Sequence, residues 1–173
     1  MARRKPDITH QLYSPANDLG VGNLLTLAYE GPAQAQLVQA LRRAGHMGVE
    51  LVGLHEGQVV GYIGFCKHLS PEGWFAVSPL GVLPTWRDKG IGADLVRYGL
   101  DFARRAGARA ITVLGDGRYY QRFGFTYKSA ENLTTPYDAA NTLLYPIAPG
   151  TAFATEHLVY PPAFNDLGLQ PTN

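Results

Sequence analysis

The sequence has little of several features that would point to a class of protein at once. Cys66 is the only cysteine among 173 residues, which excludes an internal disulfide and a zinc site built from cysteines. No apolar run approaches the roughly 20 residues that a membrane-spanning helix needs. The basic N-terminus MARRKPDITHQ lacks the apolar core of a signal peptide. We therefore expect a reduced, cytoplasmic chain that does not associate with a membrane.

The sequence also lacks an excess of either charge. Fifteen Lys and Arg face fourteen Asp and Glu, so the net charge is +1. This balance provides no general attraction to nucleic acid, and any anion must be bound by a local site. The five histidines, at positions 10, 46, 55, 68 and 157, have no partner histidine at helical spacing. We expect neither a metal site nor a nucleic-acid partner.

Composition and periodicity predict a single α/β domain over residues 1–173. Hydrophobic residues make up 46% of the chain and charged residues 17%, enough for one sizeable core. The segment ITHQLYSP predicts a first strand, and two helical patterns follow, from residue 17 or 18 to about 29 and onward to Gly45. Two apolar runs around Glu56-Gly57 then predict a hairpin.

The second half alternates between strands and helices. The predicted elements are a strand in GWFAVSPLGVLP, a helix from near Gly90 to Gly107, a strand in ARAITVLG, a short helix around RYYQRF, a strand at FGFTYKS, a long loop over 131–150 and a final strand in TAFATEHLVY. The order predicts a mixed, mostly antiparallel sheet of six or seven strands flanked by helices, rather than a doubly wound sheet.

The stretch RDKGIGADLVRYG, residues 87–99, opens the helix that follows the third strand of the predicted meander. The first turn of a helix has main-chain N–H groups without intrahelical partners, and it carries the positive end of the helix dipole. Gly90 and Gly92 leave that main chain open to an anion, and Arg87 and Lys89 add positive charge. The loop therefore has two interpretations, a phosphate site or a tight turn.

Two familiar phosphate loops do not fit this stretch. A Walker loop needs Lys and then Ser or Thr after its last glycine, but Gly92 is followed by Ala93 and Asp94. A dinucleotide fingerprint needs a third glycine at position 95, which is Leu. The pattern R-x-x-G-x-G between a strand and an amphipathic helix remains.

At this point the sequence resembles the GNAT superfamily of N-acetyltransferases. The likeness runs through residues 80–125, LGVLPTWRDKGIGADLVRYGLDFARRAGARAITVLGDGRYYQRFGF, and the ending YYQRFGF is similar to the family's F-Y-x-x-x-G-F motif. The resemblance implies the GNAT fold, with a cofactor-binding core at about 74–128. It also implies acetyl-CoA as co-substrate, an amine acceptor, and the homodimers that are frequent in the family.

The resemblance also implies roles for individual residues. The strand edge formed by Leu80, Gly81, Val82 and Leu83 would pair with the pantetheine arm, much as an added strand would. The pyrophosphate would be bound chiefly by the main chain of Arg87, Asp88, Lys89, Gly90, Ile91 and Gly92, with Ala93 completing the helix start.

Tyr120 matches the family's tyrosine, which donates a proton to the departing CoA thiolate. Its neighbour Tyr119 would lie about 100° away around the helix, so only one of the two is expected to face the thiol, and the motif favours Tyr120. Tyr119 is then expected beside the cofactor. Many family members have an Asn near the end of the preceding strand, where this chain has Asp116.

The general base is not evident from the sequence. Glu72, Ser78 and His68 are candidates by location, and none is preferred. Cys66 has no evident His neighbour to make it an acetyl carrier, and the family transfers directly in a ternary complex. The acceptor would lie between residues 17–45 and 131–165.

Three functions are compatible with these residues. The first is acetyl-CoA-dependent transfer to a primary amine of a small molecule or a peptide. The second is a non-catalytic module of the same fold that senses acyl-CoA, and the third is a regulator that binds another phosphate ligand.

Overall fold

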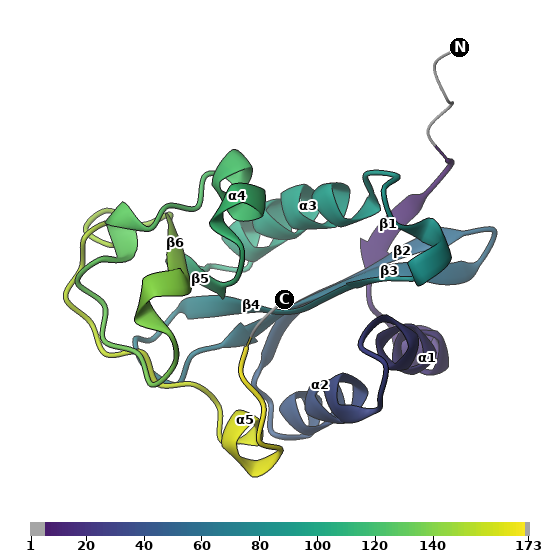
Figure 1. Ribbon diagram of the computed structural model, residues 1–173, viewed down its shortest axis with the longest axis horizontal. Helices are drawn as coiled ribbons and strands as arrows, with labels where there is room; N and C mark the ends of the chain where they lie inside the picture. Colours follow the sequence, from purple (N-terminus) through teal and green to yellow (C-terminus); the bar gives the residue numbers. More distant parts are fainter. Residues whose placement is uncertain (1–5, 172–173) are drawn as a thin grey trace.

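The structure, a computed structural model, describes residues 6–171 and is built on one six-stranded sheet (Figure 1). The strands lie side by side in the order in which they occur along the chain. Neighbouring strands are antiparallel except for β4 and β5, which are parallel. The strands are β1 (Thr9–Leu12), β2 (Met47–His55), β3 (Gln58–Lys67), β4 (Trp74–Val82), β5 (Ala110–Leu114) and β6 (Thr142–Pro146). The predicted fold class, a mixed and mostly antiparallel sheet, is confirmed.

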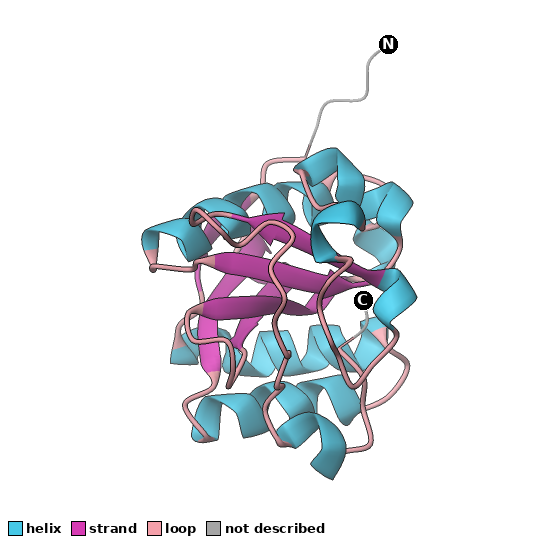
Figure 2. Ribbon diagram, turned by 90° about the vertical axis from the view of Figure 1, so that its left-hand side faces the viewer, coloured by secondary structure: helices cyan, strands magenta, loops and turns pink. Residues whose placement is uncertain are grey.

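Helices cover both faces of this sheet (Figures 1 and 2). The helices are α1 (Asp18–Ala28), α2 (Ala33–Arg43), α3 (Ile91–Arg105), α4 (Gly117–Tyr120) and α5 (Ala163–Asp166). Helices α1, α2 and α5 lie on one face, and α3 and α4 lie on the other. None of the helices within residues 6–171 has the length and apolar character that crossing a bilayer requires.

Helix α3 packs against the sheet through one apolar side, as its sequence period predicts. Ile91, Leu95 and Leu100 are almost fully buried, while basic residues occupy the opposite side. At Gly99 the helix approaches β3 so closely that an added Cβ would lie 2.4 Å from the Phe65 ring. At its start, α3 approaches the end of β4, where an added Cβ at Gly92 would lie 3.7 Å from a Val82 methyl group.

The hairpin between β2 and β3 is set by its turn chemistry. Glu56 and Gly57 both have positive φ angles, 48° and 80°, as the two central residues of a two-residue hairpin turn require. The predicted hairpin is therefore confirmed. Buried side chains of β2 and β3, among them Leu51, Ile63 and Phe65, form the centre of the core.

Strands β4 and β5 diverge halfway along their length. They pair only from Trp74 opposite Ala110 to Ala76 opposite Thr112. The pairing of β4 with β3 shifts register just beyond this point, so that β4 contains an additional residue near Ser78. Such a bulge bends a strand. From Val77 onward, β4 keeps β3 as its neighbour but no longer pairs with β5, and we call this unpaired stretch between the two strands the slot.

The C-terminal third differs from the sequence prediction. The expected strand at FGFTYKS is wrong: a 3₁₀ turn occupies Lys128–Ala130, and only Thr126 bridges to β6. The Thr126 hydroxyl accepts a hydrogen bond from the Ser129 main-chain N–H, a local bond that competes with strand pairing. The expected loop contains β6, which pairs along the whole of β5. The expected final strand is absent from residues 151–160, where single bridges replace it.

Candidate cofactor and active site

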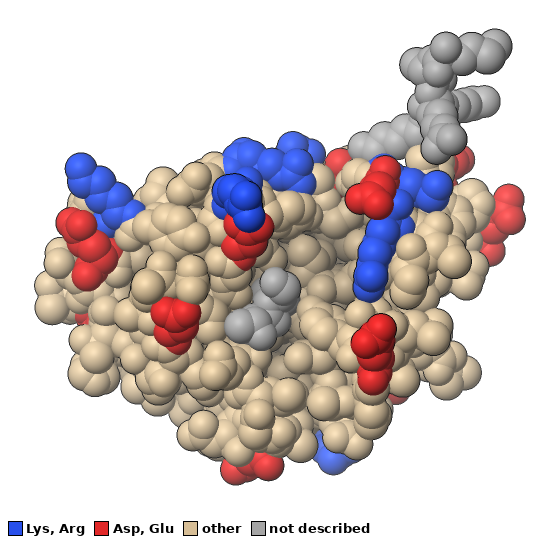
Figure 3. Space-filling model, in the orientation of Figure 1, with Lys and Arg blue, Asp and Glu red and all other residues tan. Residues whose placement is uncertain are grey.

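A cavity of about 510 Å³ lies at the N-terminus of α3, where β4 ends. It is lined by Val82, Trp86, Arg87, Asp88, Gly90, Ile91, Gly92, Ala93, Tyr119 and Arg122. Its walls therefore come from the end of β4, the loop before α3, the first turn of α3, and the segment around α4. Basic side chains lie mostly along the edge of the molecule that carries α3 and α4, and acidic side chains are scattered over this face (Figure 3).

The main chain of the loop is shaped to bind an anion. Gly90 has a φ of 79° and is followed directly by the right-handed turn of α3. A left-handed residue followed by a right-handed one directs successive N–H groups into one concavity. The first helical bond runs from the N–H of Asp94 to the Gly90 carbonyl at 3.1 Å, so the N–H groups ahead of it have no intrahelical partner. Phosphate oxygens fit this arrangement.

Gly92 provides the space that this concavity needs. A Cβ at this position would lie 2.9 Å from the Tyr119 hydroxyl and 3.7 Å from a methyl group of Val82. A side chain at this position would therefore displace the Tyr119 hydroxyl. Gly92 also lines the cavity, so its main chain is open to a ligand, as a phosphate site requires.

The C-terminal end of helix α1 is hydrogen-bonded both to the loop before α3 and to strand β4. The Arg87 guanidinium donates to the Ala28 carbonyl at 3.1 Å, and the Tyr29 hydroxyl donates to the Leu80 carbonyl at 2.7 Å. Burial raises the pKa of Tyr29 to about 12, so its hydroxyl stays a donor at neutral pH. These two bonds attach the end of α1 to the loop before α3 and to the diverging part of β4.

Most of the residues predicted to bind the cofactor lie together. Eight of them line the cavity at α3: Val82, Arg87, Asp88, Gly90, Ile91, Gly92, Ala93 and Tyr119. Lys89 is exposed and does not line it. Leu80 and Gly81 lie on the diverging half of β4, and Leu83 directly follows that strand.

Two lining residues, Trp86 and Arg122, were not predicted. Arg122 follows Tyr119 by three residues, a spacing that places both on one side of a helix and that could have indicated it.

The two adjacent tyrosines of the α4 segment point in different directions. Tyr119 is half-buried, and its hydroxyl reaches the wall of the cavity beside Gly92. Tyr120 is only 2% exposed, and its ring packs against Phe123 and Phe125. The two ring planes are inclined by 86°. Tyr119 therefore lines the cavity at the start of α3, whereas Tyr120 lies in the core beside it.

The other candidate groups differ in their protonation state and accessibility. Burial raises the pKa of the Cys66 thiol to about 12, so it is not a thiolate at neutral pH and is a poor acetyl carrier. Burial lowers the pKa of His68 to about 3, and its Nε2 lies 2.8 Å from the Thr112 hydroxyl. Ser78 is fully buried, and Glu72 is exposed in a turn. In residues 6–171 no group of three potential ligands is arranged to hold a metal ion.

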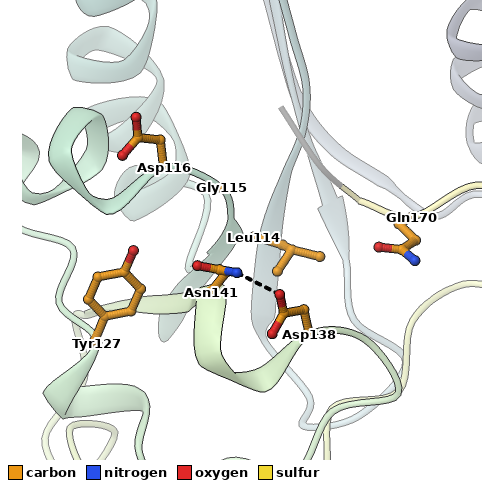
Figure 4. Close-up of a pocket in the computed structure, with 7 residues that line it drawn as sticks. All are labelled: Leu114, Gly115, Asp116, Tyr127, Asp138, Asn141 and Gln170. Carbon is orange, nitrogen blue, oxygen red and sulfur yellow. Dashed lines mark hydrogen bonds between the residues drawn. The ribbon is translucent and has the colours of Figure 1, made fainter.

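A second cavity, of about 380 Å³, lies where β5 ends (Figure 4). Leu114, Gly115 and Asp116 contribute the end of β5, and the other walls come from Tyr127, Asp138, Asn141 and Gln170. The Asn141 amide donates to the Asp138 carboxylate, and Asp116 caps α4 by accepting from the Arg118 N–H. This cavity adjoins the end of β5, and no Lys or Arg side chain of the described residues 6–171 lines it.

The mixed sheet and the glycine-containing loop before α3 are features of one class of transferase, and sequence comparison identifies that class. The sequence profile described as "Acetyltransferase (GNAT) family" matches residues 20–125. The chain belongs to this family and is an N-acetyltransferase. The resemblance predicted from residues 80–125 is confirmed.

Individual relatives extend this result. The uncharacterized N-acetyltransferase YhbS of Escherichia coli K12 is 36% identical over 124 residues, which cover 69% of this chain and 74% of that one. The crystal structure of E. coli YhbS in complex with CoA superimposes with a TM-score of 0.87 at 29% identity, over 99% of both chains. A GNAT acetyltransferase of Brucella melitensis in complex with acetyl-CoA has a TM-score of 0.78 at 29% identity, over 91% of this chain and 98% of that one.

Proposed function

We propose that this N-acetyltransferase uses acetyl-CoA and transfers its acetyl group to a primary amine of a small molecule or a peptide by direct attack in a ternary complex. The observation that carries the proposal is the cavity at the start of α3, which lies at the end of β4, the strand that stops pairing with β5 after Ala76. Two relatives of the same fold were solved with CoA or acetyl-CoA, which supports this choice of donor.

The donor would lie along the loop and the slot. Its pyrophosphate would accept hydrogen bonds from the main-chain N–H groups of the first turn of α3, with Arg87 nearby. Its pantetheine arm would follow Leu80–Leu83 and take the place that β5 vacates beyond Thr112. In this position the thioester would reach the part of the slot near Ser78, where the two strands meet.

The reaction needs few protein groups. The neutral amine nitrogen attacks the thioester carbonyl carbon, a C–N bond forms, and the C–S bond breaks as the intermediate collapses. The amine loses one proton and the departing thiolate gains one. We assign the second transfer to Tyr120, which matches the family motif, and we assign no residue to the first.

The acceptor would enter beside the end of β5. The cavity there offers carboxylate oxygens of Asp138 and Asp116 and amide groups of Asn141 and Gln170 (Figure 4). Such a lining suits an amine and would repel an anionic acceptor.

Mass spectrometry of product formation tests the proposal. The full chain is incubated with acetyl-CoA and a panel of small amines and peptides, and acetylated products are sought. We expect at least one primary amine to be acetylated, with release of one CoA per product. Binding of acetyl-CoA without transfer to any amine would instead support a sensing role. Thermal stabilisation by ATP or NAD in place of acetyl-CoA would contradict the choice of donor.

A further inference from the structure

Arg122 lies in the cavity at the start of α3, although it belongs to a different part of the chain from the phosphate loop. It occupies the 3₁₀ turn Gln121–Phe123, directly after α4, and its side chain is exposed. Its guanidinium carbon lies 4.4 Å from the centre of the Tyr119 ring and 4.9 Å from that of Phe123. Stacking on two rings restricts where this long side chain can point.

The contacts of Arg122 differ from those of the neighbouring arginines. Arg97 and Arg105 on α3 and Arg118 on α4 each pair with a carboxylate, namely Asp94, Asp101 and Asp116. Arg122 instead contacts the Tyr119 and Phe123 side chains, including a hydrogen bond to Tyr119, and among residues 6–171 it forms no ion pair with a carboxylate.

The cavity therefore has two guanidinium groups from two separate elements. Arg87 comes from the loop before α3 and Arg122 from the turn after α4, and Asp88 is the one acidic residue in the lining. Arg122 stacks on the Tyr119 ring. The hydroxyl of the same tyrosine reaches the first turn of α3 beside Gly92. An anion bound to the main chain of that turn would thus lie close to the Arg122 guanidinium.

We propose that Arg122 binds a phosphate group of the donor nucleotide and that Tyr119 is the platform that positions it. This inference rests on the proposed use of acetyl-CoA. The phosphate is either part of the pyrophosphate or the 3′-phosphate of CoA, which share the same chemistry for a guanidinium. Through this contact the site selects phosphorylated thioester donors over thioesters of pantetheine alone.

Calorimetric titration with CoA tests this role of Arg122. In the Arg122→Gln variant the Kd for CoA is expected to rise about tenfold to a hundredfold, as for the loss of a hydrogen bond to a charged group. Arg118→Gln is the matched control, because Arg118 lies on the same segment, is 92% exposed and is absent from the lining of the cavity. The Kd of Arg118→Gln for CoA should stay within about twofold of that of the wild type. Tyr119→Leu should weaken CoA binding less than Arg122→Gln does.

Two further compounds, dephospho-CoA and S-acetylpantetheine, test which phosphate group Arg122 binds and whether its effect depends on a phosphate. If Arg122 binds the 3′-phosphate, the effect of Arg122→Gln disappears with dephospho-CoA, and if it binds the pyrophosphate, the effect persists. S-acetylpantetheine has neither phosphate, so in transfer assays with this donor Arg122→Gln should leave kcat/KM unchanged. With acetyl-CoA as the donor, Arg122→Gln should raise KM while kcat stays near that of the wild type.

The possible failures are distinct. Equal CoA affinity of the wild type and Arg122→Gln would overturn the inference and leave the proposed function in place. The inference would also be overturned if Arg122→Gln lowered kcat/KM for S-acetylpantetheine as much as it lowers kcat/KM for acetyl-CoA. A wild-type chain that binds no CoA would overturn the proposed function, and the inference with it.

Discussion

The Tyr119 hydroxyl lies 2.9 Å from the point that a Cβ on Gly92 would occupy. This contact joins the segment around α4 to the first turn of α3, although 26 residues of sequence separate the pair. A side chain at Gly92 would displace the Tyr119 hydroxyl, whereas glycine leaves the main chain of α3 open to the cavity. The width of the cavity at the start of α3 therefore depends on this pair.

Replacing Gly92 by Val should fill the phosphate end of the site. The branched side chain would meet the Tyr119 hydroxyl and Val82, so we expect the Kd for acetyl-CoA to rise at least tenfold in calorimetry. Gly22→Val is the matched control, because an added Cβ at Gly22 on α1 has no atom within 4 Å. Unchanged affinity in Gly92→Val would contradict the placement of the cofactor.

The two tyrosines of the α4 segment should differ in kinetics. Tyr120→Phe removes the proposed proton donor, so kcat should fall by an order of magnitude or more while the affinity for acetyl-CoA stays within about threefold. Tyr119→Phe keeps the ring on which Arg122 stacks, and its kcat should remain near that of the wild type. Steady-state kinetics with a product of the amine screen makes the comparison. The reverse pattern would assign the proton transfer to Tyr119.

The close approach of α3 to the sheet should limit stability. In Gly99→Ala the new methyl group would lie 2.4 Å from the fully buried Phe65 ring, so we expect a loss of about 1–3 kcal/mol in the free energy of unfolding. Gly22→Ala places the same methyl group in open space on α1 and should gain about 0.5–1 kcal/mol instead. Urea denaturation distinguishes the two. A stabilised Gly99→Ala would mean that α3 can move away from β3.

His68 should make stability depend on pH. Its pKa is about 3 in the folded chain because of burial, and near 6.5 when unfolded, so the unfolded state binds more protons between these values. The stability that this difference provides is present above pH 6.5 and is lost as the pH falls toward 3.

Between pH 7 and pH 5 the wild type should lose about 2 kcal/mol more than His68→Gln. Tyr160, whose ring packs on His68, has a raised pKa caused by burial and does not titrate in this range. Urea denaturation of both proteins at the two pH values gives the difference. Parallel losses would show that His68 is not kept neutral by the fold.

Most of the fold up to residue 125 could be predicted from the sequence, because its signals are local. The Glu56-Gly57 turn, the apolar side of α3 and the glycines of the phosphate loop each act within a few residues. Most of the lining of the cavity at the start of α3 was predictable for the same reason, since a single loop and the first turn of one helix form most of it.

The remaining features depend on contacts between distant parts of the chain. Strand β6 is a short apolar run whose pairing with β5 joins segments about 30 residues apart, and it lies between Pro- and Asn-rich turns that suggested a loop. The strand expected near Thr126 was lost to a local bond with Ser129. Arg122 was missed although its spacing from Tyr119 places both on one side of the α4 segment, because only the packing of that segment on α3 shows that this side lines the cavity.

Hydrogen exchange of the full chain with and without saturating acetyl-CoA tests the central claim most directly. The cofactor should occupy the slot where β4 leaves β5 and the concavity at the start of α3. We therefore predict slower exchange in peptides that cover Leu80–Leu83 and Arg87–Ala93, and unchanged exchange in a peptide that covers Gly22. Protection confined to other segments, or no change at all, would contradict the account.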